Sequence, residues 1–330
     1  MKHLLKAALL ASATVLASAP IASALDVIIS NDNNGVGVKG KTFDLLAEEI
    51  KKRLPDADIE VHHSGALFDQ KTQIQGLQLG SAHIISPTSG IYAPHAPGVS
   101  ALTLPFLLSS PEQIVEAMKD EVVRSAFVPD LEKKNIVPVA VWMNGPRELS
   151  YKGSKPILTP ADMAGVKIRV QSVPSDIAAM KAAGANAVAM SWSEVPTSLQ
   201  QGVIDAVEPT PNALAGAGLI EIIDQVTKFG YQYSFYIVGV NKQWWDGMSD
   251  DERTAVQEAL EVATAWNFEN AAAENIKGYE AVVAAGKTVN DLTEDQRAQW
   301  VEAMKPVWEE FGTDVVGKEV MDRLQEIAGK

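Results

Sequence analysis

The stretch 165–211 constrains the fold more than any other part of the chain, because it reads as strand, helix, short strand, helix and strand. Residues 166–170 alternate apolar and polar side chains, 175–183 are a helix of small residues, 187–190 are a short apolar run, and 203–207 return as a strand. This βαβαβ order predicts an α/β fold, in which ligands bind at the carboxyl ends of the strands.

Turn and capping residues support the same order. Gly184 closes the first helix, and Ser193 is predicted to cap the second, because its hydroxyl can accept a free N–H of the first turn. That cap leaves Pro196 in the first turn, where its missing N–H costs little. Gly202 suits the left-handed residue after the helix.

Three chemically distinct side chains fall at or near the element ends of this unit: Arg169, Trp192 and Glu208. An arginine on a mostly apolar strand needs a partner, since a buried unpaired charge costs several kcal/mol. Its planar fork matches a carboxylate with two parallel hydrogen bonds. A structural salt bridge or an exposed position is the alternative explanation for Arg169. Trp192 would ordinarily be a core residue.

The same stretch resembles the signature region of the solute-binding proteins of tripartite ATP-independent periplasmic (TRAP) transporters. Weaker similarity covers nearly the whole mature chain. The matching segments are Lys-Ile-Arg-Val at 167–170, Gly-Ala at 184–185, Met-Ser-Trp-Ser-Glu-Val at 190–195, Ser-Leu-Gln-Gln-Gly-Val-Ile-Asp at 198–205, Asn-Gly-Pro-Arg at 144–147 and Trp-Trp-Asp-Gly at 244–247.

The resemblance implies a two-lobe periplasmic-binding-protein (Venus-flytrap) architecture with a long helix spanning both lobes. We expect lobe I to contain 25–144 and about 235–275, and lobe II to contain 145–234 and about 276–330. The implied role is capture of a small organic acid, such as a uronate or aldonate, by hinge closure. The implied partners are the small and large membrane subunits of the transporter; the binding protein itself is expected to be a monomer and no enzyme.

The resemblance also implies ligand-binding roles. Arg169 would anchor the ligand carboxylate and Arg147 would assist, although a solvated loop position is the alternative for Arg147. Trp192 and one aromatic side chain of the segment 231–235, with Tyr231 as the candidate, would form a wall of the pocket. An aromatic or keto-acid ligand fits such a wall as well.

Glu208 marks a departure from the family pattern, which has an acidic residue followed by Asn-Pro. This chain has Pro209, Thr210 and Pro211 instead, so the ligand-binding asparagine is missing unless Asn212 replaces it. Glu208 could accept ligand hydroxyl groups, ligate a cation bound with a keto acid, or stabilise the turn. These three alternatives stay open.

Two polar loops follow strands of the first half of the chain and are further candidates. The loop 31–34 follows the first strand and the loop 86–89 the third, and we take Asn31 and Thr88 as ligand contacts. Asp69 begins a predicted helix, and we interpret it as a helix cap in preference to a ligand contact.

Export is indicated by the first 24 residues. Lys2 and Lys6 give the N-terminus a positive charge, 4–17 is an apolar run, and Ala22-Ser-Ala24 is a cleavage site, so we expect a periplasmic protein cleaved near Ala24. The chain has no cysteine, which excludes disulfides and thiolate chemistry. A formal net charge of −14 makes nucleic-acid binding unfavourable.

The remaining elements follow from periodicity and turn residues. Strands are predicted at 25–30, 58–62, 83–86, 136–142 and within 231–240; helices at 41–54, 70–79, 111–127 and 250–285, with two more between 293 and 328. The helix 250–285 would be too long for one small lobe at about 1.5 Å per residue.

Cofactor and metal chemistry find little support. Glycines 35, 37 and 40 match G-x-G-x-x-G, but four polar residues separate them from the strand, and Glu60 lies inside the second strand. His62 and His63 are adjacent on a strand and point to opposite faces. We expect no cofactor, metal or catalytic residue. An exported enzyme and a ligand sensor on a similar fold are the alternatives, which activity screening and the neighbouring genes would distinguish.

Overall fold

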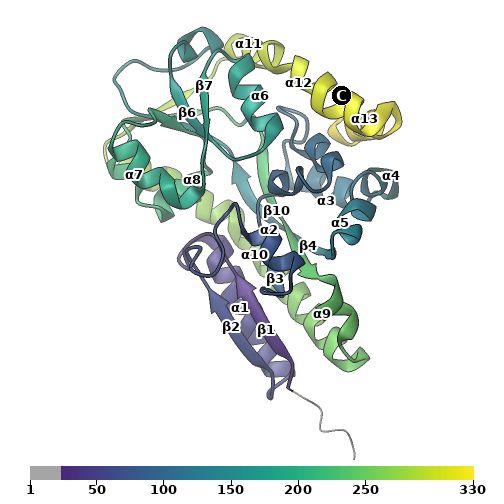
Figure 1. Ribbon diagram of the computed structural model, residues 1–330. Coiled ribbons are helices and arrows are strands. Elements are labelled where there is room, and N and C mark those ends of the chain that lie inside the picture. Colours follow the sequence, from purple (N-terminus) through teal and green to yellow (C-terminus); the bar gives the residue numbers. More distant parts are fainter. Residues whose placement is uncertain (1–23) are drawn as a thin grey trace, which may run out of the picture.

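The computed structural model describes residues 24–330 and contains two β-sheets, each flanked by helices (Figure 1). The predicted export signal, apart from Ala24, lies outside the described residues. Within them, no helix is both long enough and apolar enough to cross a bilayer.

The first sheet has five strands in the order β2-β1-β3-β10-β4. β1, β2 and β3 are parallel, and β10 is antiparallel to both of its neighbours. β10 is an inner strand between β3 and β4, and eight of its nine residues are buried. The bounds are β1 (Asp26–Ser30), β2 (Asp58–His62), β3 (Ile84–Ile85), β4 (Ile136–Pro146) and β10 (Tyr233–Asn241).

The second sheet has six strands in the order β11-β9-β5-β8-β6-β7. β6 is parallel to both β7 and β8, which confirms the predicted βαβαβ unit. The bounds are β5 (Leu149–Tyr151), β6 (Lys167–Val170), β7 (Asn186–Ala189), β8 (Ala206–Val207), β9 (Gln225–Lys228) and β11 (Thr288–Asp291).

The helices lie around the two sheets. Their bounds are α1 (Val38–Arg53), α2 (Gln73–Gln78), α3 (Pro111–Lys119), α4 (Glu121–Ser125), α5 (Val128–Lys133), α6 (Pro174–Ala182), α7 (Val195–Gln200), α8 (Pro211–Gly216), α9 (Lys242–Gly247), α10 (Asp250–Ala284), α11 (Glu294–Met304), α12 (Pro306–Trp308) and α13 (Asp314–Ala328).

The long helix α10 joins the two halves of the molecule, as predicted. It begins with a capping box in which Ser249 and Glu252 satisfy each other's backbone N–H groups. Its first turns place Val256 and Ala263 in the core of the first sheet, whereas Val282, near its end, packs in a core with Val207 and other residues of the second sheet.

The chain also crosses between the sheets in two short segments. β4 ends at Pro146 and β5 begins at Leu149, so the crossing falls in the predicted region 144–150. The return crossing lies between Lys228 and Tyr233. The exact limits of the two lobes stay a prediction.

Three local predictions were wrong. The helix predicted at 111–127 is broken, because Asp120 is extended and its side chain caps α4. The cap near Trp192 is Ser191 and not Ser193. Ser191 is extended, and Glu194 three residues later completes a capping box around a 3₁₀ turn. The strand predicted at 203–207 is reduced to β8 at 206–207, because the chain is still in a turn after Gly202.

Candidate functional site

Arg169 is a buried cation whose hydrogen-bond partners are all neutral. It lies on β6, between β7 and β8, and is 2% exposed. Its Nε and Nη2 donate to the Met190 carbonyl oxygen at 3.1 and 2.8 Å, and Nη2 also donates to Oε1 of Gln70 at 2.7 Å. Burial, with a contribution from nearby Arg147, lowers the pKa of Arg169 to about 10, so it is charged at neutral pH. Within residues 24–330 it forms no salt bridge.

Arg147, in contrast, is neutralised within the protein. It follows β4, and its Nε and Nη2 both contact Oε2 of Glu208, which follows β8. Tyr231 donates its hydroxyl to the same oxygen at 3.2 Å. All three side chains are buried. Although burial opposes it, the Glu208 carboxylate raises the pKa of Arg147.

A cavity of about 30 Å³ lies beside these arginines. The Arg169 guanidinium stands 5.4 Å from the centre of the Trp192 ring, a cation–π arrangement at the cavity wall. The lining residues come from both sheets and their loops: Asn33, Gln70, Thr88, Asn144, Arg147, Arg169, Gln171, Trp192, Pro209, Thr210, Ala213 and Tyr236.

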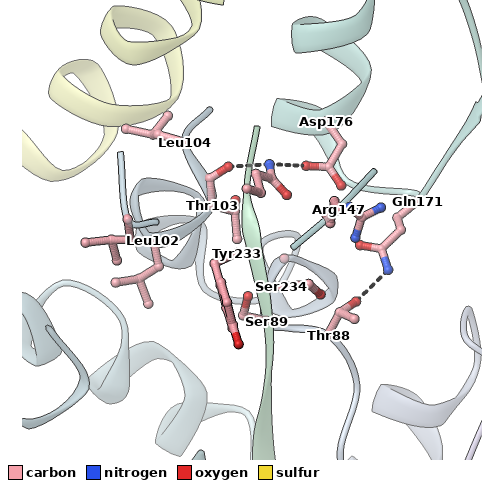
Figure 2. Close-up of a pocket in the computed structure, with 13 residues that line it drawn as sticks. Thr88, Ser89, Leu102, Thr103, Leu104, Arg147, Gln171, Asp176, Tyr233 and Ser234 are labelled. Carbon is pink, nitrogen blue, oxygen red and sulfur yellow. Dashed lines mark hydrogen bonds between the residues drawn. The ribbon is translucent and has the colours of Figure 1, made fainter. Parts of the chain in front are cut away.

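A second cavity of about 10 Å³ adjoins the first and shares Thr88, Arg147 and Gln171 with it (Figure 2). Three of its other lining residues are bonded to one another: the Gln232 amide donates to Asp176 at 3.0 Å and to the Thr103 carbonyl oxygen at 2.5 Å. Burial raises the pKa of Asp176. This cavity adds polar groups beyond Arg147 but has room for little more than a water molecule.

Side chains from the loops of the first sheet reach across to the second. These contacts bring the two halves together around the cavity. They are Gln171 to Thr88 at 2.7 Å, Asn34 to the Gly216 carbonyl oxygen at 2.6 Å, Ser191 to Asp69 at 3.0 Å, and Lys71 to Glu194 at 3.3 Å.

The structure brings four of the seven predicted site residues to the cavity: Arg169, Arg147, Trp192 and Thr88. Glu208 and Tyr231 lie in contact with Arg147 and are not among its lining residues. Asn31 shapes its own loop, because its Oδ1 accepts the Asn33 N–H at 3.0 Å; Asn33 itself lines the cavity.

The turn after β8 is held against α10. Asn212 donates to the Asn144 carbonyl oxygen at 2.9 Å and to Oδ1 of Asn275 at 3.0 Å. Thr210 caps α8 and donates to Oδ1 of Asn144 at 3.0 Å. Asn212 is not among the residues that line the cavity beside the arginines; Pro209 and Thr210 are.

Sequence reasoning missed several lining residues. Gln171 stands two positions after Arg169, on the same face of the chain in a strand-like run, so alternation could have found it. Asn144 lies within the Asn-Gly-Pro-Arg segment that had been singled out. Gln70 and Tyr236 carry no comparable signal, because only the tertiary structure brings them to Arg169 and Trp192.

Comparison with known proteins identifies the family. Residues 33–314 match the bacterial extracellular solute-binding proteins, family 7. The chain belongs to this family. It is 32% identical over 278 residues to the C4-dicarboxylate-binding periplasmic protein DctP of Rhodobacter capsulatus, covering 83% of this chain and 82% of that protein.

Solved structures support the assignment of this chain to family 7. A TRAP periplasmic solute-binding protein from Sulfurospirillum deleyianum, with bound succinate, is 27% identical with a TM-score of 0.85, covering 92% of this chain and all of that one. The sugar acid binding protein DctPAm from Advenella mimigardefordensis, in complex with galactonate, has a TM-score of 0.87 at 20% identity, covering 93% and 98%. The two-lobe periplasmic-binding fold and a role as an extracytoplasmic solute receptor follow.

Proposed function

We propose that this family 7 protein binds a hydroxylated monocarboxylate, a sugar acid such as an aldonate or a uronate, in the cavity beside Arg169. The charge balance carries the proposal. Arg147 is neutralised by Glu208, whereas Arg169 is buried with neutral partners only. Arg169 forms no salt bridge within residues 24–330 and therefore suits one ligand carboxylate. A second carboxylate would have to compete with Glu208 for Arg147 and would lie near the buried carboxyl group of Asp176.

The other lining residues suit a polyhydroxylated ligand. Amides and hydroxyls can both donate to and accept from ligand hydroxyl groups, as Asn33, Thr88 and Gln171 would do here. Trp192 and Tyr236 would pack against the C–H face of the ligand. Glu208 and Tyr231 would act by positioning Arg147, and Asn31 would act by positioning Asn33. None of the three would touch the ligand.

A C4-dicarboxylate is the second candidate, favoured by the similarity to the Rhodobacter capsulatus protein. Its second carboxylate would need Arg147, which would first have to leave Glu208. An aromatic or keto acid would use Trp192 but few of the polar groups. A sugar acid would bind the charge of Arg169 with its carboxylate and the amide groups of the cavity with its hydroxyl groups.

The proposed role in transport is that of the exported receptor. The chain would be cleaved near Ala24, act as a monomer in the periplasm without catalysing a reaction, and deliver its closed form to the small and large membrane subunits of a TRAP transporter. Family membership and the two-lobe fold support this role.

Calorimetry with galactonate and succinate tests the proposal. The wild type is expected to bind galactonate more tightly than succinate. Arg169→Lys should weaken galactonate binding about 30-fold to several thousand-fold, because one ammonium cannot replace two charge-assisted hydrogen bonds.

Arg53→Lys is the matched control, because Arg53 is the last residue of α1, pairs with Glu49 and Glu258, and is not among the residues that line the cavity. It should bind as the wild type does. Loss of less than about threefold in folded Arg169→Lys would remove Arg169 from the site. Tighter binding of succinate than of galactonate would favour the dicarboxylate.

A further inference from the structure

The side-chain amide oxygen of Gln70 accepts a hydrogen bond from Arg169, the proposed anchor of the ligand carboxylate. Gln70 precedes α2, which packs against β3 and β10 of the first sheet, whereas Arg169 lies in the second sheet. The two side chains meet across the cavity at 2.7 Å, and both are buried. This contact joins the two halves of the protein through the group that would bind the ligand.

The other hydrogen bonds of Arg169 limit how a carboxylate can approach. The edge formed by Nε and Nη2 is directed at the Met190 carbonyl oxygen. Within residues 24–330, Nη1 donates to no protein atom. A carboxylate that binds with two parallel bonds would therefore use Nη1 and Nη2, and it would need the Nη2 hydrogen that Gln70 accepts.

We infer that the Gln70 amide oxygen occupies the position of one ligand carboxylate oxygen on Arg169, and that Gln70 thereby sets the affinity of the site. The inference rests on the proposed function, in which Arg169 anchors a carboxylate. A neutral amide oxygen makes a weaker bond to a guanidinium than a carboxylate does, so the ligand displaces it. The amide then turns and donates its Nε2 hydrogens to the bound carboxylate.

This arrangement explains why an amide suits position 70. Glutamine accepts from Arg169 before the ligand binds and donates to the ligand afterwards, because its side chain carries both an acceptor and a donor. A glutamate would only accept. It would neutralise Arg169 permanently and repel the incoming carboxylate.

Gln70→Glu tests the inference, with Gln171→Glu as the matched control. Gln171 lines the same cavity and also bonds across it, to the Thr88 hydroxyl, but it makes no hydrogen bond to Arg169. Both variants add one negative charge. Calorimetry should show galactonate binding at least about 100-fold weaker in Gln70→Glu. Gln171→Glu should lose about tenfold, because it changes one proposed hydroxyl contact but leaves Arg169 available to the ligand carboxylate. Equal losses in both variants would overturn the inference.

Small-angle scattering without any ligand gives an independent measurement. In Gln70→Glu, an ion pair between the introduced carboxylate and Arg169 would hold the two lobes together. This variant should therefore have a smaller radius of gyration than Gln70→Ala, whose short side chain makes no contact with Arg169. Equal radii would overturn the inference.

The two proposals fail in different ways. A wild type that binds neither galactonate nor succinate would contradict the proposed function, and the scattering comparison would still test Gln70. If the wild type binds galactonate, Arg169→Lys does not, and Gln70→Glu binds as the wild type does, only the inference about Gln70 is wrong.

Discussion

Glu148 is the buried carboxyl that ties the two crossing segments to the long helix. Its Oε2 accepts the Phe229 and Gly230 N–H groups at 2.5 and 2.9 Å, and its Oε1 accepts the hydroxyl of Tyr279 on α10. Burial raises the pKa of Glu148 to about 7, although these hydrogen bonds lower it in part. A single side chain thus links the β4–β5 crossing, the β9–β10 crossing and α10.

The raised pKa predicts a pH-dependent stability. Between pH 4.5 and 7 the folded state binds a proton at Glu148 more tightly than the unfolded state does. The stability from that proton is therefore fully present below pH 4.5 and is lost as the pH rises through 7. Glu148→Gln keeps an acceptor for the two N–H groups and does not titrate.

Urea unfolding of both proteins at pH 5 and pH 8 measures the effect. The free energy of unfolding of the wild type, relative to Glu148→Gln, should fall by about 2–3 kcal/mol over this range. The other titrating groups are common to both proteins and cancel in the difference. A difference that does not change with pH would mean that Glu148 has an ordinary pKa.

At the scale of elements, the close approach of α8 to α10 depends on Gly278. A Cβ at this position would meet the carbonyl group of Pro211 and would lie 2.8 Å from the Asn212 nitrogen. These neighbours are backbone atoms, which cannot rotate away as a side chain can. The first turn of α8 follows Pro209 and Thr210, so this contact also positions two residues of the cavity.

Gly278→Ala should therefore lower stability by about 1–3 kcal/mol, although alanine is the better helix former by about 1 kcal/mol. Galactonate binding should weaken as well, because α8 must move away from α10. Thermal unfolding and calorimetry measure the two effects.

Gly247 in α9 provides the control, since nothing lies within 4 Å of its added Cβ. Gly247→Ala should be as stable as the wild type or more stable by up to about 1 kcal/mol. If Gly278→Ala is stabilised to the same degree, α8 does not pack closely enough on α10 to exclude a methyl group at position 278.

At the scale of the whole molecule, the two lobes are in contact around the site. Gln171 bonds to Thr88 across the cavity, and Asn34 bonds to Gly216 between the same two halves of the protein. The cavity of about 30 Å³ is far smaller than ligand pockets, which typically measure about 300–1,000 Å³. A sugar acid can therefore enter only after the lobes separate, by rotation about the crossing segments and α10.

We expect the ligand-free protein to alternate between this closed arrangement and an open one, and galactonate to hold it closed. Addition of galactonate should therefore lower the mean radius of gyration of the wild type in small-angle scattering. Arg169→Lys at the same concentration should show no such decrease, because it leaves the site unoccupied. An unchanged radius in a wild type that binds galactonate by calorimetry would argue against hinge closure.

Local patterns in the sequence were sufficient for most of the fold. The alternation in 166–170, the nearly unbroken helical run in 250–285 and the small-residue helix before Gly184 reflect interactions within a few residues of each other. Such interactions form in any tertiary context, which is why the βαβαβ unit and the long helix were predicted correctly. Arg169 was found in the same way, as a charge on an apolar strand.

Only the tertiary structure decided which groups partner the charges. Arg147 and Glu208 are 61 residues apart, and Gln70 and Arg169 are 99 apart. No periodicity relates such positions, because their contact depends on how the crossing strands and the two lobes come together. The sequence by itself therefore determined an α/β chain with an arginine on a mostly apolar strand. The packing of the lobes determined that Arg147 pairs with Glu208, whereas Arg169 is buried and donates to neutral groups.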